Sequence, residues 1–128
     1  MPTATVIPEL PYSDVLRAAA WLATAFGLKE RLRIGRHRVQ LEFGQGAVIA
    51  VRSEDDPAPQ SVLVRIGDVD RHCEVARRAG ATIVAEPADY PYGERQYTAV
   101  DLGGHRWTFS QSIADVDPGD WGGELLGA

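Results

Sequence analysis

The pattern of apolar and polar residues repeats along the chain. Strand-like and helix-like spacings follow one another in the same order in both halves. Apolar side chains recur at helical spacing between Asp14 and Gly27, and again between Asp68 and Gly80. Asp is a favoured helix N-cap and Gly a favoured C-terminal cap, so these residues predict where both helices begin and end. Each predicted helix follows one strand-like run and precedes three others, which indicates a duplicated strand–helix–three-strand unit.

The strand predictions come from short alternating or β-branched runs bounded by turn residues. Residues 38–43 alternate most clearly, with Val39, Leu41 and Phe43 on one face. Residues 53–60 are polar and contain two prolines, which predicts a linker. The predicted strands are 3–9, 29–34, 38–43 and 47–52 in the first half, and 61–66, 82–86, 96–101 and 106–110 in the second.

Together these elements predict an α+β fold in a single domain, residues 1–128, with helices on the outer face of a curved mixed sheet that surrounds a cavity. Its expected parts are module one at about 3–52, the linker 53–60, module two at about 61–111, and a tail at 112–128.

Composition narrows the classes of function. The 128 residues carry a formal net charge of −5, which disfavours nucleic acid as a partner because phosphate binding needs a surplus of Lys and Arg. The single cysteine, Cys73, excludes an internal disulfide. Neither a signal peptide nor a membrane-spanning stretch is evident, so we expect a cytoplasmic protein without a membrane partner.

Three stretches resemble the vicinal oxygen chelate superfamily, which includes glyoxalase I, bleomycin-resistance proteins and extradiol dioxygenases. They are Tyr12-Ser13-Asp14 with its helix ending Ala25-Phe26-Gly27-Leu28; Val64-Arg65-Ile66-Gly67-Asp68 with the later Arg78-Ala79-Gly80; and Tyr92-Gly93-Glu94-Arg95 leading to Asp101-Leu102-Gly103-Gly104-His105. The last resembles a strand–turn–strand motif that in the family usually reads Asp-Pro-x-Gly-His/Asn. The resemblance spans roughly residues 3–111 and implies paired βαβββ modules.

The resemblance also implies where metal ligands would lie in the family's metal-dependent enzymes. Those positions fall on Ile7, Ala50, Ser61 and Thr108, with Glu9 the nearest carboxylate to the first of them. Ile and Ala offer no lone pairs, and Ser and Thr are weak neutral ligands. We therefore expect no metal and no other cofactor. His37, His72 and His105 are scattered, and a turn histidine such as His105 is expected to bond to backbone.

The stretch 89–97 is the most function-like, because it combines tyrosines, both charge signs and a glycine within an insertion that breaks the repeat. Strand parity turns Arg106 and Thr108 toward the cavity, and Trp107 and Phe109 toward the helices. Arg65 shares a face with Ser61 and Leu63. The candidate ligand-binding residues are Ile7, Glu9, Ala50, Ser61, Leu63, Tyr92, Glu94, Arg95, Arg106 and Thr108.

The favoured interpretation is a glyoxalase/bleomycin-resistance-like protein that binds a small organic molecule without metal and is not an enzyme. One alternative is a metal-dependent lyase, isomerase or dioxygenase, or a metal-free acid–base catalyst using Glu9, Glu42 or Glu94. Another is a structural module without catalysis. The resemblance implies a homodimer, to which Trp121 and Leu125 of the tail could contribute.

Overall fold

The computed structural model describes residues 4–55 and 58–127. Residues 1–3, 56–57 and 128 lie outside the described residues, and with them the start of the predicted strand 3–9, part of the predicted linker 53–60 and the last residue of the tail. Module one comprises β1 (Glu9–Tyr12), α1 (Val15–Phe26), β2 (Lys29–Ile34), β3 (Arg38–Phe43) and β4 (Gly46–Arg52). Module two comprises β5 (Ser61–Arg65), α2 (Val69–Arg78), β6 (Thr82–Tyr90), β7 (Glu94–Val100) and β8 (Arg106–Ser112), followed by the 3-10 helix η1 (Pro118–Trp121).

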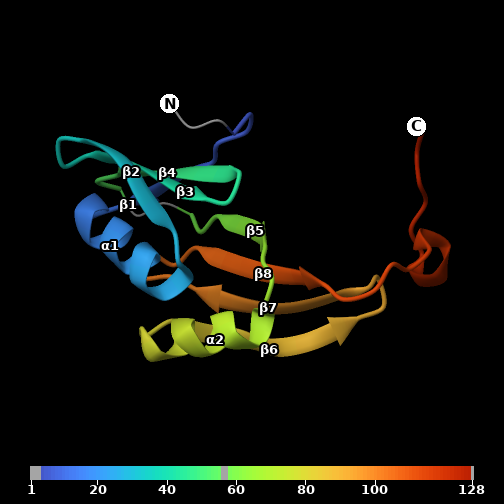
Figure 1. Ribbon diagram of the computed structural model, residues 1–128. Coiled ribbons are helices and arrows are strands. Elements are labelled where there is room, and N and C mark those ends of the chain that lie inside the picture. The colour runs from blue at the N-terminus through green and yellow to red at the C-terminus, as the bar shows by residue number, and fades with distance from the viewer. Residues whose placement is uncertain (1–3, 56–57, 128) are drawn as a thin grey trace.

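Each module forms its own four-stranded sheet, ordered β1-β4-β3-β2 in one and β5-β8-β7-β6 in the other (Figure 1). The first strand of each module pairs in parallel with its last strand, and the other pairs are antiparallel. The α+β prediction is therefore confirmed. The eight strands form two mixed sheets, however, instead of one that closes around a cavity.

The helix ends follow the predicted caps. The Asp14 carboxylate accepts a hydrogen bond from the backbone N–H of Arg17, and the Asp68 carboxylate accepts one from Arg71. Gly27 ends α1 with a φ of 79°, a left-handed conformation that glycine adopts without strain. Of the helices in the described residues, none has the length and apolar character that crossing a membrane requires.

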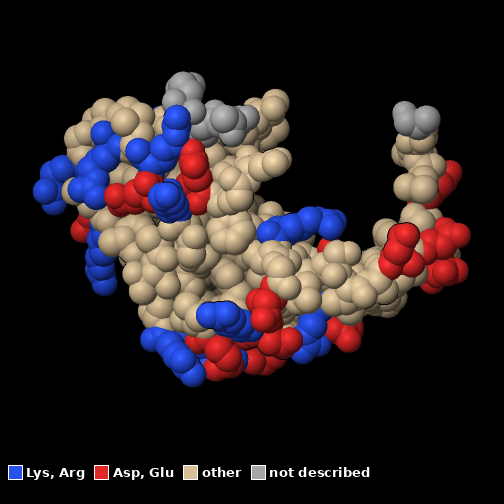
Figure 2. Space-filling view, in the orientation of Figure 1, with Lys and Arg blue, Asp and Glu red and all other residues tan. Residues whose placement is uncertain are grey.

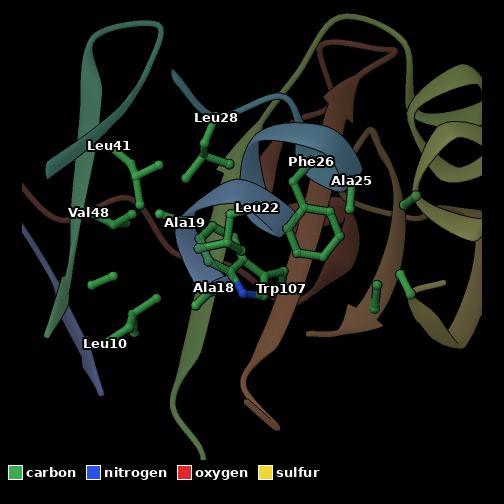
Figure 3. Packing of buried hydrophobic residues seen from close by; sticks show 14 of the residues in the cluster. Leu10, Ala18, Ala19, Leu22, Ala25, Phe26, Leu28, Leu41, Val48 and Trp107 are labelled. Carbon is green, nitrogen blue, oxygen red and sulfur yellow. The ribbon is translucent and has the colours of Figure 1, made fainter. Parts of the chain in front are cut away.

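Helix α1 contributes to the core of both modules. Toward module one, Ala18, Ala19 and Leu22 pack among Leu10, Leu41 and Val48, as Figure 3 shows. Toward module two, the ring of Phe26 lies 5.3 Å from that of Trp107 and 4.9 Å from that of Phe109. A single hydrophobic cluster therefore joins the two modules on their helix side, and the opposite faces of the sheets, hereafter the open faces, point away from it.

Two strand predictions are wrong in extent by more than two residues. The first strand is Glu9–Tyr12 and not 3–9, because Leu10 and Tyr12 are the side chains that reach the core, at 2% and 3% exposed. Residues 87–90, which lay outside the predicted strand 82–86, continue β6 as far as Tyr90 with shifts in register. The second hairpin is consequently long, and it reverses at residues 91–93.

Candidate ligand-binding cleft

A cleft of about 630 Å³ lies between the β3–β4 hairpin of module one and strand β5 of module two. Strand β5 is the edge of its sheet, so its outer side is not covered by another strand. The lining is largely apolar and includes two glycines of the β3–β4 hairpin and one arginine. The lining residues are Val6, Pro8, Leu28, Phe43, Gly44, Gln45, Gly46, Ala47, Val48, Val62, Leu63, Val64, Arg65 and Trp107.

The open face of module two carries a chain of hydrogen bonds next to this cleft. The Tyr92 hydroxyl donates to Gln96 Oε1 at 3.0 Å, and Gln96 Nε2 donates to Ser110 Oγ at 3.0 Å. Ser110 Oγ then donates to Glu94 Oε1 at 2.9 Å. The side chain of Glu94 is only 12% exposed and lies 3.4 Å from Arg65, which is 71% exposed. Arg65 therefore presents a largely exposed guanidinium in the lining of the cleft.

Four predicted ligand-binding residues of β5 and β8 lie on the same open face. The register pairs Ser61 with Arg106 and Leu63 with Thr108, so these side chains stand side by side. Thr108 Oγ1 lies 2.9 Å from Thr98 Oγ1, which gives the face a second polar pair. Leu63 is 59% exposed although it is large and apolar. The predicted parity is confirmed, because Trp107 of the same strand is completely buried on the helix side.

Two predicted ligand-binding residues point away from the open faces. Ala50 lies opposite Leu10 and Val39 in the sheet register and is 1% exposed in the core, so Ile49 takes the open-face position in β4. Arg95 has the parity of the buried Tyr97.

On that side Arg95 joins β7 to its surroundings. Its guanidinium bonds to Asp70 of α2 at 2.9 Å and to Asp89 of β6 at 2.8 Å, and the bond to Asp70 is the main reason that the pKa of that carboxyl lies below its ordinary value. Arg95 thus ties β7 to α2 and is not among the residues that line the cleft.

The residues at the positions where the resemblance implies metal ligands supply few donor atoms. Ile7 precedes β1 and has no lone pair, and Glu9, beside it on the open face of module one, pairs with Arg38 at 2.9 Å. Ser61 and Thr108 supply only neutral hydroxyls. Among residues 4–55 and 58–127, no group of three or more His, Cys, Asp or Glu side chains is placed to hold an ion.

A buried carboxylate that sequence reasoning did not single out connects the modules. Asp101 is 6% exposed and accepts hydrogen bonds from the Tyr12 hydroxyl at 2.6 Å and from Trp107 Nε1 at 2.9 Å. Its other oxygen accepts from the backbone N–H groups of Gly103 and His105, each at 2.9 Å. Burial, and then the charge of Asp101, raise the pKa of Tyr12 and keep its hydroxyl protonated.

His105 has the backbone role that the sequence predicted. Its Nδ1 accepts the N–H of Gln60 at 3.0 Å, and its Nε2 donates to the carbonyl oxygen of Pro11 at 2.7 Å, which corresponds to a neutral imidazole. The ring is fully buried. The histidine therefore holds β1 of module one against the start of β5, and its nitrogens have no free lone pair for a ligand.

His72, on α2, turns into the junction between the modules. Its Nε2 lies 2.8 Å from the carbonyl oxygen of Phe26, its Nδ1 bonds to the Tyr97 hydroxyl, and its ring lies 4.1 Å from that of Phe109. Burial lowers the pKa of His72 below its ordinary value, despite the opposing effect of the Phe26 carbonyl. The adjacent Cys73 is completely buried, and burial raises the pKa of its thiol, as expected for an inert core cysteine.

Comparison with known proteins agrees with this architecture. The sequence model of the family described as Glyoxalase/Bleomycin resistance protein/Dioxygenase superfamily matches residues 5–109. TioX from Micromonospora sp. ML1, whose crystal structure is known, is 36% identical in sequence to this chain. The two structures have a TM-score of 0.77, over 84% of this chain and 98% of that one. A glyoxalase/bleomycin resistance protein/dioxygenase from Nocardioides shares the fold at a TM-score of 0.72 and 17% identity, over 95% of this chain and 88% of that one.

A curated relative matches over a shorter stretch. An uncharacterized protein from Mycobacterium bovis is 32% identical over 59 residues, which are 46% of this chain and 39% of that protein. The match therefore spans well under half of the relative's length.

Proposed function

The chain belongs to the glyoxalase/bleomycin resistance protein/dioxygenase superfamily, and from this premise we propose that it binds a small organic molecule in the cleft beside β5, without a resident metal ion. The observation that carries the proposal is the cleft itself. Its volume of about 630 Å³ suits a small molecule, since ligand pockets usually measure roughly 300–1,000 Å³ and are mainly apolar with a few polar groups.

The lining indicates the chemistry of the ligand. Its apolar side chains favour a compact, largely apolar body such as a planar aromatic group. The one charged side chain of the lining among the described residues, Arg65, favours a carbonyl or anionic group at one end of that body. The overall charge of −5, by contrast, would favour a cation, but none of the acidic residues within 4–55 and 58–127 lines the cleft.

We further propose that the protein works as a cytoplasmic homodimer. Each open face carries large apolar side chains exposed to solvent: Leu63 at 59% in module two, and Leu32 and Ile34 at 44% and 43% in module one. Buried Gln40 Oε1, on the open face of module one, accepts no hydrogen bond from the described residues. A second copy packed on the open side would cover the leucines and enclose the cleft.

Thermal unfolding in the presence of candidate ligands tests the proposal, because a ligand that binds only the folded state must raise the melting temperature. A panel of planar aromatic acids, planar aromatic amines and cationic glycopeptides covers both charge classes. We expect a stabilising aromatic acid whose effect is lost in Leu63→Asp and reduced in Arg65→Ala. Val84→Asp, at an exposed position on β6 outside the cleft lining, is the matched control and should retain binding.

Two results would contradict the proposal. A panel that leaves the melting temperature unchanged at millimolar concentration removes the small-molecule role. Stoichiometric zinc, nickel, manganese or iron retained by the purified protein after mild chelation removes the metal-free role, and would favour the metal-dependent lyase, isomerase or dioxygenase in its place.

A further inference from the structure

Two oppositely charged segments lie at the two ends of the molecule. The basic hairpin, residues 29–38, contains five Lys and Arg residues and one Glu. The acidic tail, residues 113–127, contains four Asp and Glu residues and no Lys or Arg. In Figure 2 the positive charges gather over module one and the negative charges mark the projecting tail, with a deep concavity between them.

The charges of both segments are incompletely neutralised within the chain. In the basic hairpin, Arg31, Arg33 and Arg38 pair with Glu42, Glu30 and Glu9. Lys29 and Arg36 form no ion pair within the described part of the chain, and neither do the four tail carboxylates Asp115, Asp117, Asp120 and Glu124. Each segment thus retains charge that a partner of opposite sign would neutralise.

Both segments also expose apolar side chains. Leu32 and Ile34 lie on the outermost strand of the first sheet, with the open-face parity of their register partners Gln40 and Arg38. In the tail, Trp121 is 42% exposed, Leu125 81% and Leu126 85%. An edge strand with exposed apolar residues is a surface on which a further segment of chain can pack.

The tail is directed away from the body by specific contacts at its base. The carbonyl oxygen of Gly93 accepts the N–H groups of Ile113 and Ala114 at 2.9 and 3.2 Å, and the Tyr92 ring lies 5.6 Å from that of Trp121. Glycine is required there, since a Cβ at position 93 would lie 2.2 Å from the Ala114 carbonyl oxygen. Figure 1 shows that the tail turns toward the open side, at the opposite end of the molecule from the β2–β3 turn.

From this arrangement we propose that the acidic tail of one copy lies across the basic hairpin of a second copy. The occupant has to be another chain, because the tail and the hairpin of one chain stand at opposite ends (Figure 1). A two-fold axis between those ends brings each tail onto the other hairpin, so the contact forms twice. The inference rests on the proposed homodimer and deepens it, since it assigns the surfaces that meet.

Cross-linking between two full-length variants tests the contact. One copy carries Leu125→Cys, and the other carries Ile34→Cys with an affinity tag that separates mixed from self-linked products. A short bismaleimide is added to the equimolar mixture at low salt. Buried Cys73 serves as the internal blank, and wild-type protein should not link. The matched control replaces Ile34→Cys with Val84→Cys, which lies at the corresponding edge of module two and is equally exposed, 44% against 43%.

We expect the mixed product with Ile34→Cys to exceed that with Val84→Cys at least fivefold. At 1 M salt the yield should fall at least twofold, because the screening length shrinks to about 3 Å. Equal yields at the two positions, in protein that sediments as a dimer, would overturn the tail contact and leave the dimer intact. Sedimentation as a monomer at the concentration used for linking would overturn the dimer and the contact together.

Discussion

Replacing the carboxylate of Asp101 should show how much the junction between the modules contributes to the free energy of unfolding, apart from the rest of the core. In Asp101→Ala, the Tyr12 hydroxyl and the Trp107 indole N–H lose their acceptor in a fully buried environment. Each stranded buried donor costs about 1–3 kcal/mol, so we expect the free energy of unfolding to fall by about 4 kcal/mol. That loss lies near the upper end of the effects of single substitutions.

Two conservative variants refine the estimate. Tyr12→Phe removes one donor but leaves the carboxylate with three, so the loss should be about 1.5 kcal/mol. The loss of stability in Asp101→Asn should lie between those in Asp101→Ala and Tyr12→Phe, at about 2–3 kcal/mol. In either orientation of the side chain, its amide N–H₂ faces one of the two pairs of donors. Asp55→Ala removes an exposed carboxylate and should change stability by less than about 0.5 kcal/mol.

Urea unfolding followed by circular dichroism and tryptophan fluorescence measures all four variants. Protein concentration must be held constant, because association would add to the apparent stability. A loss of less than about 1 kcal/mol in Asp101→Ala would refute the reasoning, since two buried donors without an acceptor should lower the free energy of unfolding by more than that. A loss in Asp55→Ala as large as that in Asp101→Ala would refute it equally, by showing that burial is not the cause.

Two further predictions concern the same junction. Gly103→Ala should destabilise the protein by about 1–3 kcal/mol in urea unfolding, because its Cβ would lie 2.6 Å from Cδ1 of the hydrogen-bonded Tyr12 ring. Gly67→Ala, where a Cβ meets nothing within 4 Å, is the matched control and should be near neutral. Because burial lowers the pKa of His72 in the folded state, the unfolded chain binds the proton first, and stability should fall as the pH drops below about 6.5. Unfolding measured at pH 7.5 and 5.5 should show this loss, and His72→Gln should reduce the slope; an unchanged slope would assign it to other groups.

The sequence predicted the parts of the fold that depend on local chemistry. The Asp14 and Asp68 caps and the helical spacing that follows them are set within a few residues, and both helices begin where the caps indicate. The alternation in residues 38–43 likewise placed Val39 and Leu41 in the core. These features survive in the structure because tertiary packing acts in the same direction as the local preference.

Predictions about faces failed where the pattern was uninformative. Residues 47–51 are Ala-Val-Ile-Ala-Val, which has no alternation, and a register error of one residue moves every side chain to the opposite face. Ala50 was therefore assigned to the cavity although Ile49 holds that position. Arg95 was misplaced for a related reason. The face on which it lies is known only once Arg95 is assigned to β7, and the predicted strand began two residues after the observed start of β7 at Glu94.

The junction could not have been predicted from one sequence. Tyr12 and Asp101 are 89 positions apart, and His72 meets the Phe26 carbonyl across 46 positions. The two members of each pair become neighbours only when both modules pack against α1. Sequence patterns predicted the modules, therefore, and the contacts that join them had to come from the structure.

The distribution of apolar surface supports the proposal that the open side has an occupant. On the helix side, one hydrophobic cluster that includes residues of α1 serves both sheets. On the open side Leu63 stays 59% exposed, and Leu125 and Leu126 are exposed by more than 80%. Fully burying one leucine is worth about 1.5–3 kcal/mol, so covering these three would contribute several kcal/mol. That free energy is available only to an occupant of the open side, whether ligand or second copy, and not to any rearrangement of the finished core.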